Sequence, residues 1–200
     1  MKVAAPRKYY YSDIHPKQFA LWIFLGTIIM AFAGLTSAFI VRRGAGDWTL
    51  YKIPSVFLVS TLTILLSSVS LQWAYHTYKL ENYAKHRAAL LITLLLGIVF
   101  VALQYTGWKQ LSNLGIRLQG NPSGAFFYVI SGFHALHVVG GLVILFVFLI
   151  KSFTFKEPVK RLLEEVNPER MIGHKLMLTY WHFVGILWIY LYGFLYIFSL

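Results

Sequence analysis

Five long apolar runs free of Asp, Glu, Lys and Arg divide this 200-residue chain. Each run reaches the length of roughly 20 residues that a helix needs to cross a hydrocarbon core. The sequence therefore predicts an all-α integral membrane protein, a five-transmembrane-helix bundle that forms a single membrane domain over residues 1–200. The predicted spans are residues 18–41, 54–78, 88–108, 124–150 and 176–200.

The charged residues lie between these runs, and their distribution predicts the orientation of the bundle. Only 12% of the residues are charged, about half of the roughly 25% typical of soluble domains. Of the 18 Lys and Arg, 13 fall in the N-terminal segment and in the second and fourth connections. Because cytoplasmic loops collect Lys and Arg, we expect the N-terminal segment 1–17 to be cytoplasmic and the C-terminus periplasmic.

The composition excludes several classes of function. The chain contains no cysteine, so disulfides, thiolate metal sites and cysteine nucleophiles are excluded. The net charge of +11 is divided among short segments between the spans rather than gathered in one patch, so we expect no nucleic-acid partner. The first 17 residues show no cleavable signal pattern, and the first span is expected to remain as an anchor.

Three histidines stand out within the spans. His134 and His137 lie three residues apart in the segment SGFHALHVVGG, residues 131–141, and therefore share one helix face. His182 follows Trp181 in the last span. Polar groups in a lipid-embedded helix are costly and usually face the bundle interior. Two interpretations stay open: the imidazoles ligate haem or a metal, or they hydrogen-bond across helices or contact a lipid headgroup.

A count of depth along the helices favours the second interpretation. His137 lies 14 residues before Lys151, about 21 Å at 1.5 Å per residue. His182 lies seven residues after Lys175, about 10 Å by the same rise. Two axial ligands of one haem should lie at nearly equal depth, and a mismatch of about 10 Å argues against a bis-histidine site.

The histidine spacing also differs from that of helical zinc motifs, in which two histidines stand four residues apart. On the residues alone, ligation is therefore the less favoured of the two interpretations. The residues expected to make hydrogen bonds within the bundle or to contact lipid are His134, His137, Trp181 and His182.

The second span carries a row of hydroxyl side chains, STLTILLSSVS, residues 60–70. Such hydroxyls can bond to the preceding turn or to a neighbouring helix. A polar permeation path is the alternative, and packing is favoured because no charge accompanies the row. In the first span Gly34 and Ala38 form a small-residue face of the kind that lets helices approach closely.

Several of these segments together resemble subunit III of the haem–copper oxidases, the cytochrome c oxidase family. The last span, YWHFVGILWIYLY, is similar to the terminal helix of that family, and SGFHALHVVGG to the helix that pairs two histidines with glycines. Span three, LGIVFVALQYTGW, matches the family's pattern at Gly97, Phe100 and Gln104, span two resembles its hydroxyl-rich helix, and FAGL at residues 32–35 fits its first helix. The resemblance covers all five spans in order and indicates the short five-helix bacterial form, which lacks the first two helices of a seven-helix member.

The resemblance implies a noncatalytic subunit of a proton-pumping respiratory oxidase in the bacterial cytoplasmic (inner) membrane. Haem and copper would lie on partner subunits and none on this chain, which would bind structural phospholipid. The implied main partner is oxidase subunit I, together with other oxidase subunits and membrane lipids, and a respiratory supercomplex is left open. Subunit III of a quinol oxidase and the related accessory protein of nitric oxide reductase are alternatives of the same class. A small membrane cytochrome b is the alternative from a different class.

The sequence departs from the family at three positions that often carry a carboxylate. Aligned on FAGL, the buried glutamate of many members falls at Ile28, and the glutamate after the Gln of span three falls at Gly107. The aspartate that usually follows WHFV is Gly185. The departures affect any proton-handling role that the resemblance implies and leave the packing and lipid roles unchanged.

Overall fold

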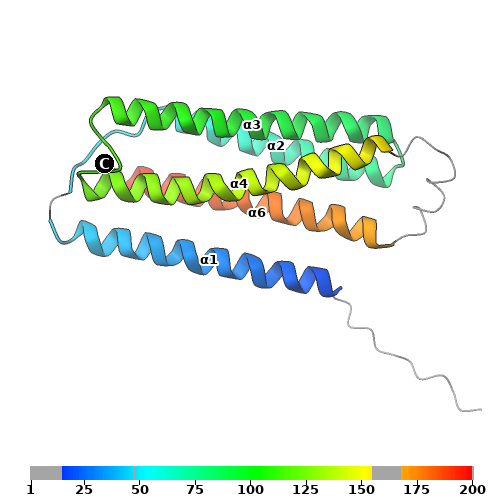
Figure 1. Ribbon diagram of the computed structural model, residues 1–200, viewed down its shortest axis with the longest axis horizontal. Helices are drawn as coiled ribbons and strands as arrows, with labels where there is room; N and C mark the ends of the chain where they lie inside the picture. The colour runs from blue at the N-terminus through cyan, green and yellow to red at the C-terminus, as the bar shows by residue number, and fades with distance from the viewer. Residues whose placement is uncertain (1–14, 47, 155–167, 200) are drawn as a thin grey trace, which may run out of the picture.

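The computed structural model describes residues 15–46, 48–154 and 168–199. Over these ranges the chain folds into five helices, and all five are long and apolar enough to cross a membrane, which confirms the predicted all-helical, five-span architecture. Successive helices run in opposite directions, so that α1, α3 and α6 point one way and α2 and α4 the other (Figure 1). The helices are α1 (Pro16–Arg43), α2 (Val56–Lys79), α3 (Tyr83–Asn113), α4 (Pro122–Thr154) and α6 (Pro168–Ser199).

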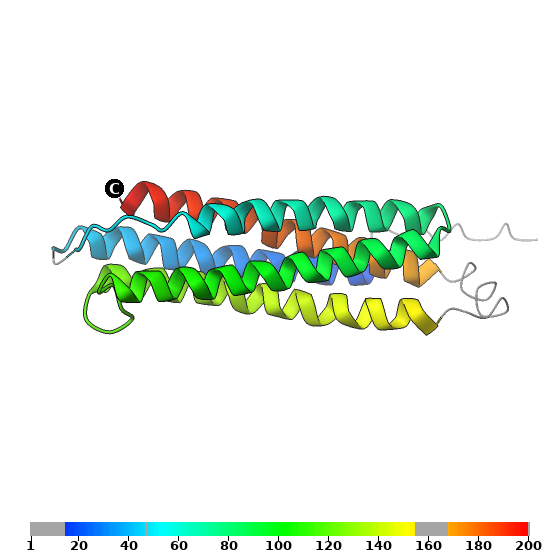
Figure 2. The ribbon, with the colours of Figure 1, turned by 90° about the horizontal axis from the view of Figure 1, so that it is seen from above.

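Four of the helices form a ring, and the first lies outside it. Both α2 and α4 pack against α3 on one side and against α6 on the other, while α1 packs mainly against α4 and α6. In Figure 1, α1 runs along one edge of the bundle, and Figure 2 shows the other helices side by side from above. The small-residue face of α1 is exposed, and a Cβ placed at Gly34 would have no atom within 4 Å. Gly34 and Ala38 therefore bring no helix of this bundle close to α1.

Helices α1, α3 and α6 begin before their predicted spans, because the prediction started each of these spans directly after a charged residue. Helix α2 instead begins at Val56, two residues inside its predicted span. Helix α3 begins at Tyr83, where the side chain of Asn82 accepts a hydrogen bond from the backbone N–H of Lys85 (3.2 Å). Helix α6 begins at Pro168, a residue suited to a first helical turn because its missing N–H would have no partner there. Residues 1–14 of the predicted N-terminal segment, 155–167 of the fourth connection and Leu200 of the last predicted span lie outside the described residues.

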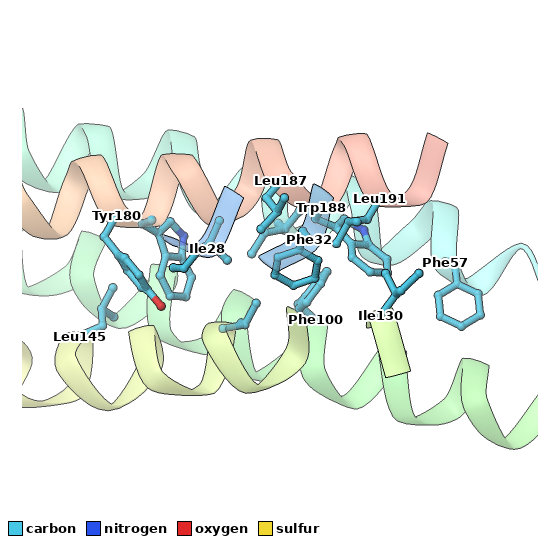
Figure 3. Packing of buried hydrophobic residues seen from close by; sticks show 14 of the residues in the cluster. Ile28, Phe32, Phe57, Phe100, Ile130, Leu145, Tyr180, Leu187, Trp188 and Leu191 are labelled. Carbon is cyan, nitrogen blue, oxygen red and sulfur yellow. The ribbon is translucent and has the colours of Figure 1, made fainter. Parts of the chain in front are cut away.

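Interlocking aromatic rings fill the centre of the bundle (Figure 3). Phe100 of α3 and Trp188 of α6 meet edge to face, with ring centroids 5.4 Å apart. Phe57 of α2 meets Phe127 of α4 in the same way at 5.3 Å. Edge-to-face contacts of this kind add about 0.5–1.5 kcal/mol to the burial of the rings. Phe32 of α1 joins the same cluster, and aromatic packing thereby connects all five helices.

The hydroxyl row of α2 connects this helix to α3. The Ser60 hydroxyl accepts a hydrogen bond from Nε2 of Gln104 (3.0 Å), and the Ser70 hydroxyl donates to the carbonyl of Ala89 (3.0 Å). Other hydroxyls of the row, those of Thr61, Thr63 and Ser67, donate to carbonyls of the preceding turn. The structure thus confirms that these hydroxyls bond backwards and across to a neighbouring helix.

Candidate functional site

His134 lies at the centre of the bundle and is wholly buried. Its ring is surrounded by aromatic rings from three other helices: Phe32 of α1 (centroids 6.4 Å apart), Phe100 of α3 (6.0 Å) and Trp188 of α6 (5.0 Å). Neither ring nitrogen has a hydrogen-bond partner among the described residues. A flat macrocycle bound to this imidazole would have to displace one of these rings, so the surroundings are those of a packed side chain.

His137 and His182 are half-buried, in contrast to His134. Nδ1 of His137 lies 2.7 Å from the carbonyl of Phe133 in the preceding turn of α4, and its ring centroid is 5.8 Å from that of Phe32. Nδ1 of His182 is buried and has no hydrogen-bond partner in the described parts of the chain. Across the same ranges, no group of three or more His, Cys, Asp or Glu side chains could hold a metal ion.

Trp181 connects α6 to three other helices. Its indole N–H donates to the Ser67 hydroxyl of α2 (3.0 Å). Its ring lies against two glycines: a Cβ at Gly97 of α3 or at Gly141 of α4 would come within 3.0–3.1 Å of the indole. Glycine therefore allows the ring to lie between α3 and α4. The neighbouring Gly140 meets nothing within 4 Å, so only one of the paired glycines makes the close approach.

The depth argument from the sequence is wrong. Gly141 of α4 lies beside Tyr180 and Trp181 of α6, and the Tyr180 hydroxyl donates to the carbonyl of His137 (2.9 Å). In this antiparallel register, the depths of His137 and His182 differ by about 5 Å at 1.5 Å per residue, rather than by about 10 Å. The error arose because Lys175 was taken as the end of the helix, whereas α6 begins at Pro168. The packing around His134, and not the depth of the histidines along their helices, therefore argues against the interpretation that they ligate haem.

A second aromatic and histidine cluster, which sequence reasoning missed, lies at the end of the bundle where α2 joins α3. The rings of Tyr78 and His174 stack with centroids 4.0 Å apart, and His86 lies 5.1–5.2 Å from both. His86 is buried, and its Nδ1 lies 2.8 Å from the carbonyl of Ala74. Both histidines stand next to Lys or Arg in the sequence and were therefore assigned to connections. The asparagine cap at Asn82 was the signal that would have placed His86 within a helix.

The three positions at which the resemblance implied a carboxylate are packed against neighbouring helices to different degrees. Ile28 is buried in the core. A Cβ at Gly107 would lie 2.5 Å from Cζ of Phe57, so the phenyl ring occupies the space of a side chain at this position. At Gly185 a Cβ would lie 3.2 Å from the hydroxyl of Ser68. At Gly107 in particular, a glutamate would require the Phe57 ring to move.

An open apolar groove lies between α1 and the ring of helices. It has a volume of about 490 Å³. Gly140 and Gly173 lie in its lining, where the absence of side chains deepens it, and no charged residue lines it. The lining residues are Leu21, Phe24, Gly140, Ile144, Phe148, Gly173, Leu176, Met177 and Tyr180.

Comparisons with known proteins agree with the resemblance in the sequence. Residues 47–200 match the family model described as cytochrome c oxidase subunit III. Cytochrome c oxidase subunit 3 of Oryctolagus cuniculus is 33% identical over 135 residues, 68% of this chain and 47% of the rabbit protein. The protein of the same name from Pan troglodytes is 30% identical over 186 residues, 88% of this chain and 67% of its own length.

This chain spans about half the length of the first of these curated relatives. The matched region nevertheless takes in α2, α3, α4 and α6 entirely, together with the histidine segment and the glycines that contact Trp181. These helices, their aromatic core and the matches agree, and the chain therefore belongs to the cytochrome c oxidase subunit III family.

Proposed function

We propose that this protein is a noncatalytic subunit III of a bacterial respiratory haem–copper oxidase, most similar to that of cytochrome c oxidase. The observation that carries the proposal is the family match over residues 47–200, which coincides with a bundle of apolar helices. In this role the chain packs laterally against subunit I in the cytoplasmic membrane. Haem and copper lie on the partner subunits, which carry out oxygen reduction.

The packing of the buried histidines supports a noncatalytic role. A ligand to haem or copper needs a nitrogen directed at open space for the cofactor. His134 is instead surrounded by three aromatic rings, and neither of its ring nitrogens faces such a space. His134 therefore acts in packing, and the half-buried His137 is available for contact with lipid.

The charge distribution supports an orientation with the N-terminus in the cytoplasm. The turn between α2 and α3, the end of α4 and the start of α6 lie at the same end of the bundle as the start of α1 (Figure 1). The sequence segments that adjoin these helix ends hold 13 of the 18 Lys and Arg. By the positive-inside rule this end faces the cytoplasm, and the end of α6 faces the periplasm.

The groove between α1 and the helix ring supports a role in holding lipid. It lies within the membrane-spanning helices, where acyl chains are the available solvent, and its lining is apolar. An acyl chain filling it would bridge α1, α4 and α6. Structural lipid in this groove would therefore strengthen the attachment of α1, which packs less extensively against its neighbours than the other helices do.

Purification from the native membrane tests the proposal. The chain is extracted in a mild detergent, and the proteins that co-purify are identified by mass spectrometry. The expected result is a stable complex with a large multispan, haem-bearing subunit, and the identity of the remaining subunits distinguishes a cytochrome c oxidase from a quinol oxidase. Isolation of a single functional chain without such a partner contradicts the proposal. A Soret band on the isolated chain would favour the small cytochrome b instead.

A further inference from the structure

A pocket of about 390 Å³ lies where α3 ends and α4 begins, at the end of the bundle opposite to the histidine cluster. It is open to the surface, and we call it the α3–α4 pocket. Two cations, Lys109 and Arg117, lie in its lining together with three aromatic rings. The lining residues are Tyr105, Trp108, Lys109, Ser112, Arg117, Leu118, Gln119 and Tyr128.

Hydrogen bonds hold the walls of this pocket in place. The Tyr128 hydroxyl donates to the carbonyl of Trp108 (3.0 Å), at the end of α3, and to that of Ile116 (2.9 Å), in the loop. The indole N–H of Trp108 donates to the hydroxyl of Ser131 (3.0 Å). A Cβ at Gly124 would lie 2.6 Å from the Arg117 carbonyl, so glycine at this position lets the loop lie directly on α4. The pocket is therefore built before any ligand arrives.

The described residues that line the pocket carry a net positive charge. Residues 105–128 contain Lys109 and Arg117 and no Asp or Glu. By the positive-inside rule this end of the bundle is depleted in cations, yet two of the five Lys and Arg assigned to it lie in this one pocket. Nζ of Lys109 lies 4.8 Å from the centre of the Tyr105 ring, which holds the ammonium group at the mouth. An anionic ligand is therefore the chemistry that the pocket favours.

An exposed apolar stripe on α3 leads from the middle of the bundle to this pocket. Residues 95, 98, 102, 105 and 109 follow one another at intervals of three or four, so they share one helix face, and all five are exposed. From Leu95 to Tyr105 the stripe runs for ten residues, about 15 Å at 1.5 Å per residue. This is about the depth of one leaflet, half of the roughly 30 Å hydrocarbon core. An acyl chain on the stripe would place its headgroup at Lys109.

We propose that the α3–α4 pocket binds the phosphate-bearing headgroup of an anionic phospholipid, with one acyl chain lying on the stripe from Leu95 to Tyr105. Arg117 and Lys109 donate charge-assisted hydrogen bonds to the phosphate oxygens, and Trp108 and Tyr105 lie at the interfacial level of the glycerol backbone. The inference rests on the proposed membrane placement and does not depend on the partner subunit. The site is distinct from the apolar groove, which lies among other helices near the opposite end of the bundle.

Native mass spectrometry of the full chain, in the assembly with which it purifies, tests the inference. The probes are phosphatidylglycerol and phosphatidylcholine with identical acyl chains, added to delipidated protein. The double variant Lys109→Gln/Arg117→Gln removes both cations from the pocket. Lys52→Gln is the matched control, because Lys52 is an exposed cation in the connection between α1 and α2, at the same end of the bundle, and does not line the pocket.

The expected result is one phosphatidylglycerol site whose affinity falls by about tenfold or more in the double variant, because hydrogen bonds between charged groups are stronger than those between neutral groups. The control variant keeps the site, and phosphatidylcholine does not occupy it. Equal binding of phosphatidylglycerol by the double variant and the unmodified protein overturns the inference, as does equal binding of phosphatidylcholine. Displacement of the lipid by millimolar inorganic phosphate would make the pocket a free-anion site and would also overturn it.

A second measurement uses the unmodified protein and is independent of the folding of any variant. Phosphatidylglycerol carrying a photoreactive diazirine in its acyl chain is crosslinked to the protein, and the labelled peptides are mapped. Labelling along Leu95–Tyr105 supports the inference, and labelling confined to other helices overturns it. Either outcome leaves the co-purification with oxidase subunits unchanged, so failure of the lipid site and failure of the proposed function can be told apart.

Discussion

The contact between Gly107 and Phe57 gives a prediction whose magnitude follows from the structure. Replacing Gly107 by Ala adds one methyl group, which would lie 2.5 Å from Cζ and 2.7 Å from Cε2 of Phe57. The phenyl ring cannot simply swing away, because Phe57 is wholly buried and packs against Phe127 (5.3 Å) and Trp188 (6.4 Å) on its other sides. Either α3 or the ring must shift.

Two opposing effects determine the size of the change. Alanine is favoured over glycine in a helix interior by about 0.8–1.0 kcal/mol, whereas overpacking a core costs about 1–3 kcal/mol. The matched control is Gly34→Ala in α1, where the new methyl group would meet no atom within 4 Å. The helix preference is common to both variants, so the difference between them isolates the steric cost. We expect Gly107→Ala to be less stable than Gly34→Ala by about 1–3 kcal/mol.

Reversible unfolding of the purified chain in mixtures of a mild detergent and sodium dodecyl sulfate, followed by circular dichroism, measures this difference. Combining Gly107→Ala with Phe57→Leu provides a further check, because shortening the ring should relieve the clash. A double-mutant cycle is then expected to show a favourable coupling of about 0.5–3 kcal/mol. Equal stabilities of the two alanine variants, or a coupling energy of zero, would refute the argument that Phe57 occupies this space.

Three further predictions concern cofactors, protons and packing. Replacing His134 by Gln should leave the haem content of the purified complex unchanged, as measured by its pyridine haemochrome spectrum, and loss of one haem equivalent would contradict the packing role. Carbodiimide labelling followed by peptide mapping should modify loop acids such as Glu164 or Glu165, with no modified residue inside the five spans, because the spans contain no carboxylate. Replacing Ser67 by Ala keeps the Trp181 indole and removes the acceptor of its N–H, so unfolding should show a loss of about 0.6 kcal/mol, the average for interhelical hydrogen bonds in membranes. A loss of several kcal/mol would mean that the ring itself had moved.

Three properties were predictable from the sequence: that the chain is an integral membrane protein, how many helices it forms, and roughly where each helix begins and ends. Because lipid tolerates few charges, an uncharged apolar run of roughly 20 residues is enough to identify a membrane-spanning helix. The hydroxyl row of α2 was likewise interpretable, because a buried hydroxyl must find a carbonyl or another polar partner wherever the helix packs. The motifs around His134 and Trp181 identified the family before any contact was known.

Only the tertiary structure shows which face of each helix points into the bundle. In a membrane the outer surface of a helix is as apolar as its core-facing side, so hydropathy carries little information about burial. His134 is therefore wholly buried while His137, on the same helix face, is half-buried, and the sequence treats them alike.

The histidine cluster and the packing at Gly107 show the same limit for positions far apart in the chain. His86 and His174 are 88 residues apart and meet only because α3 and α6 both continue past their charged residues. Whether position 107 has room for a side chain depends on the ring of Phe57, which lies on another helix. Composition and spacing determine which segments become helices in lipid, whereas their register, their rotation and the partner of each side chain are set by the close packing of all five together.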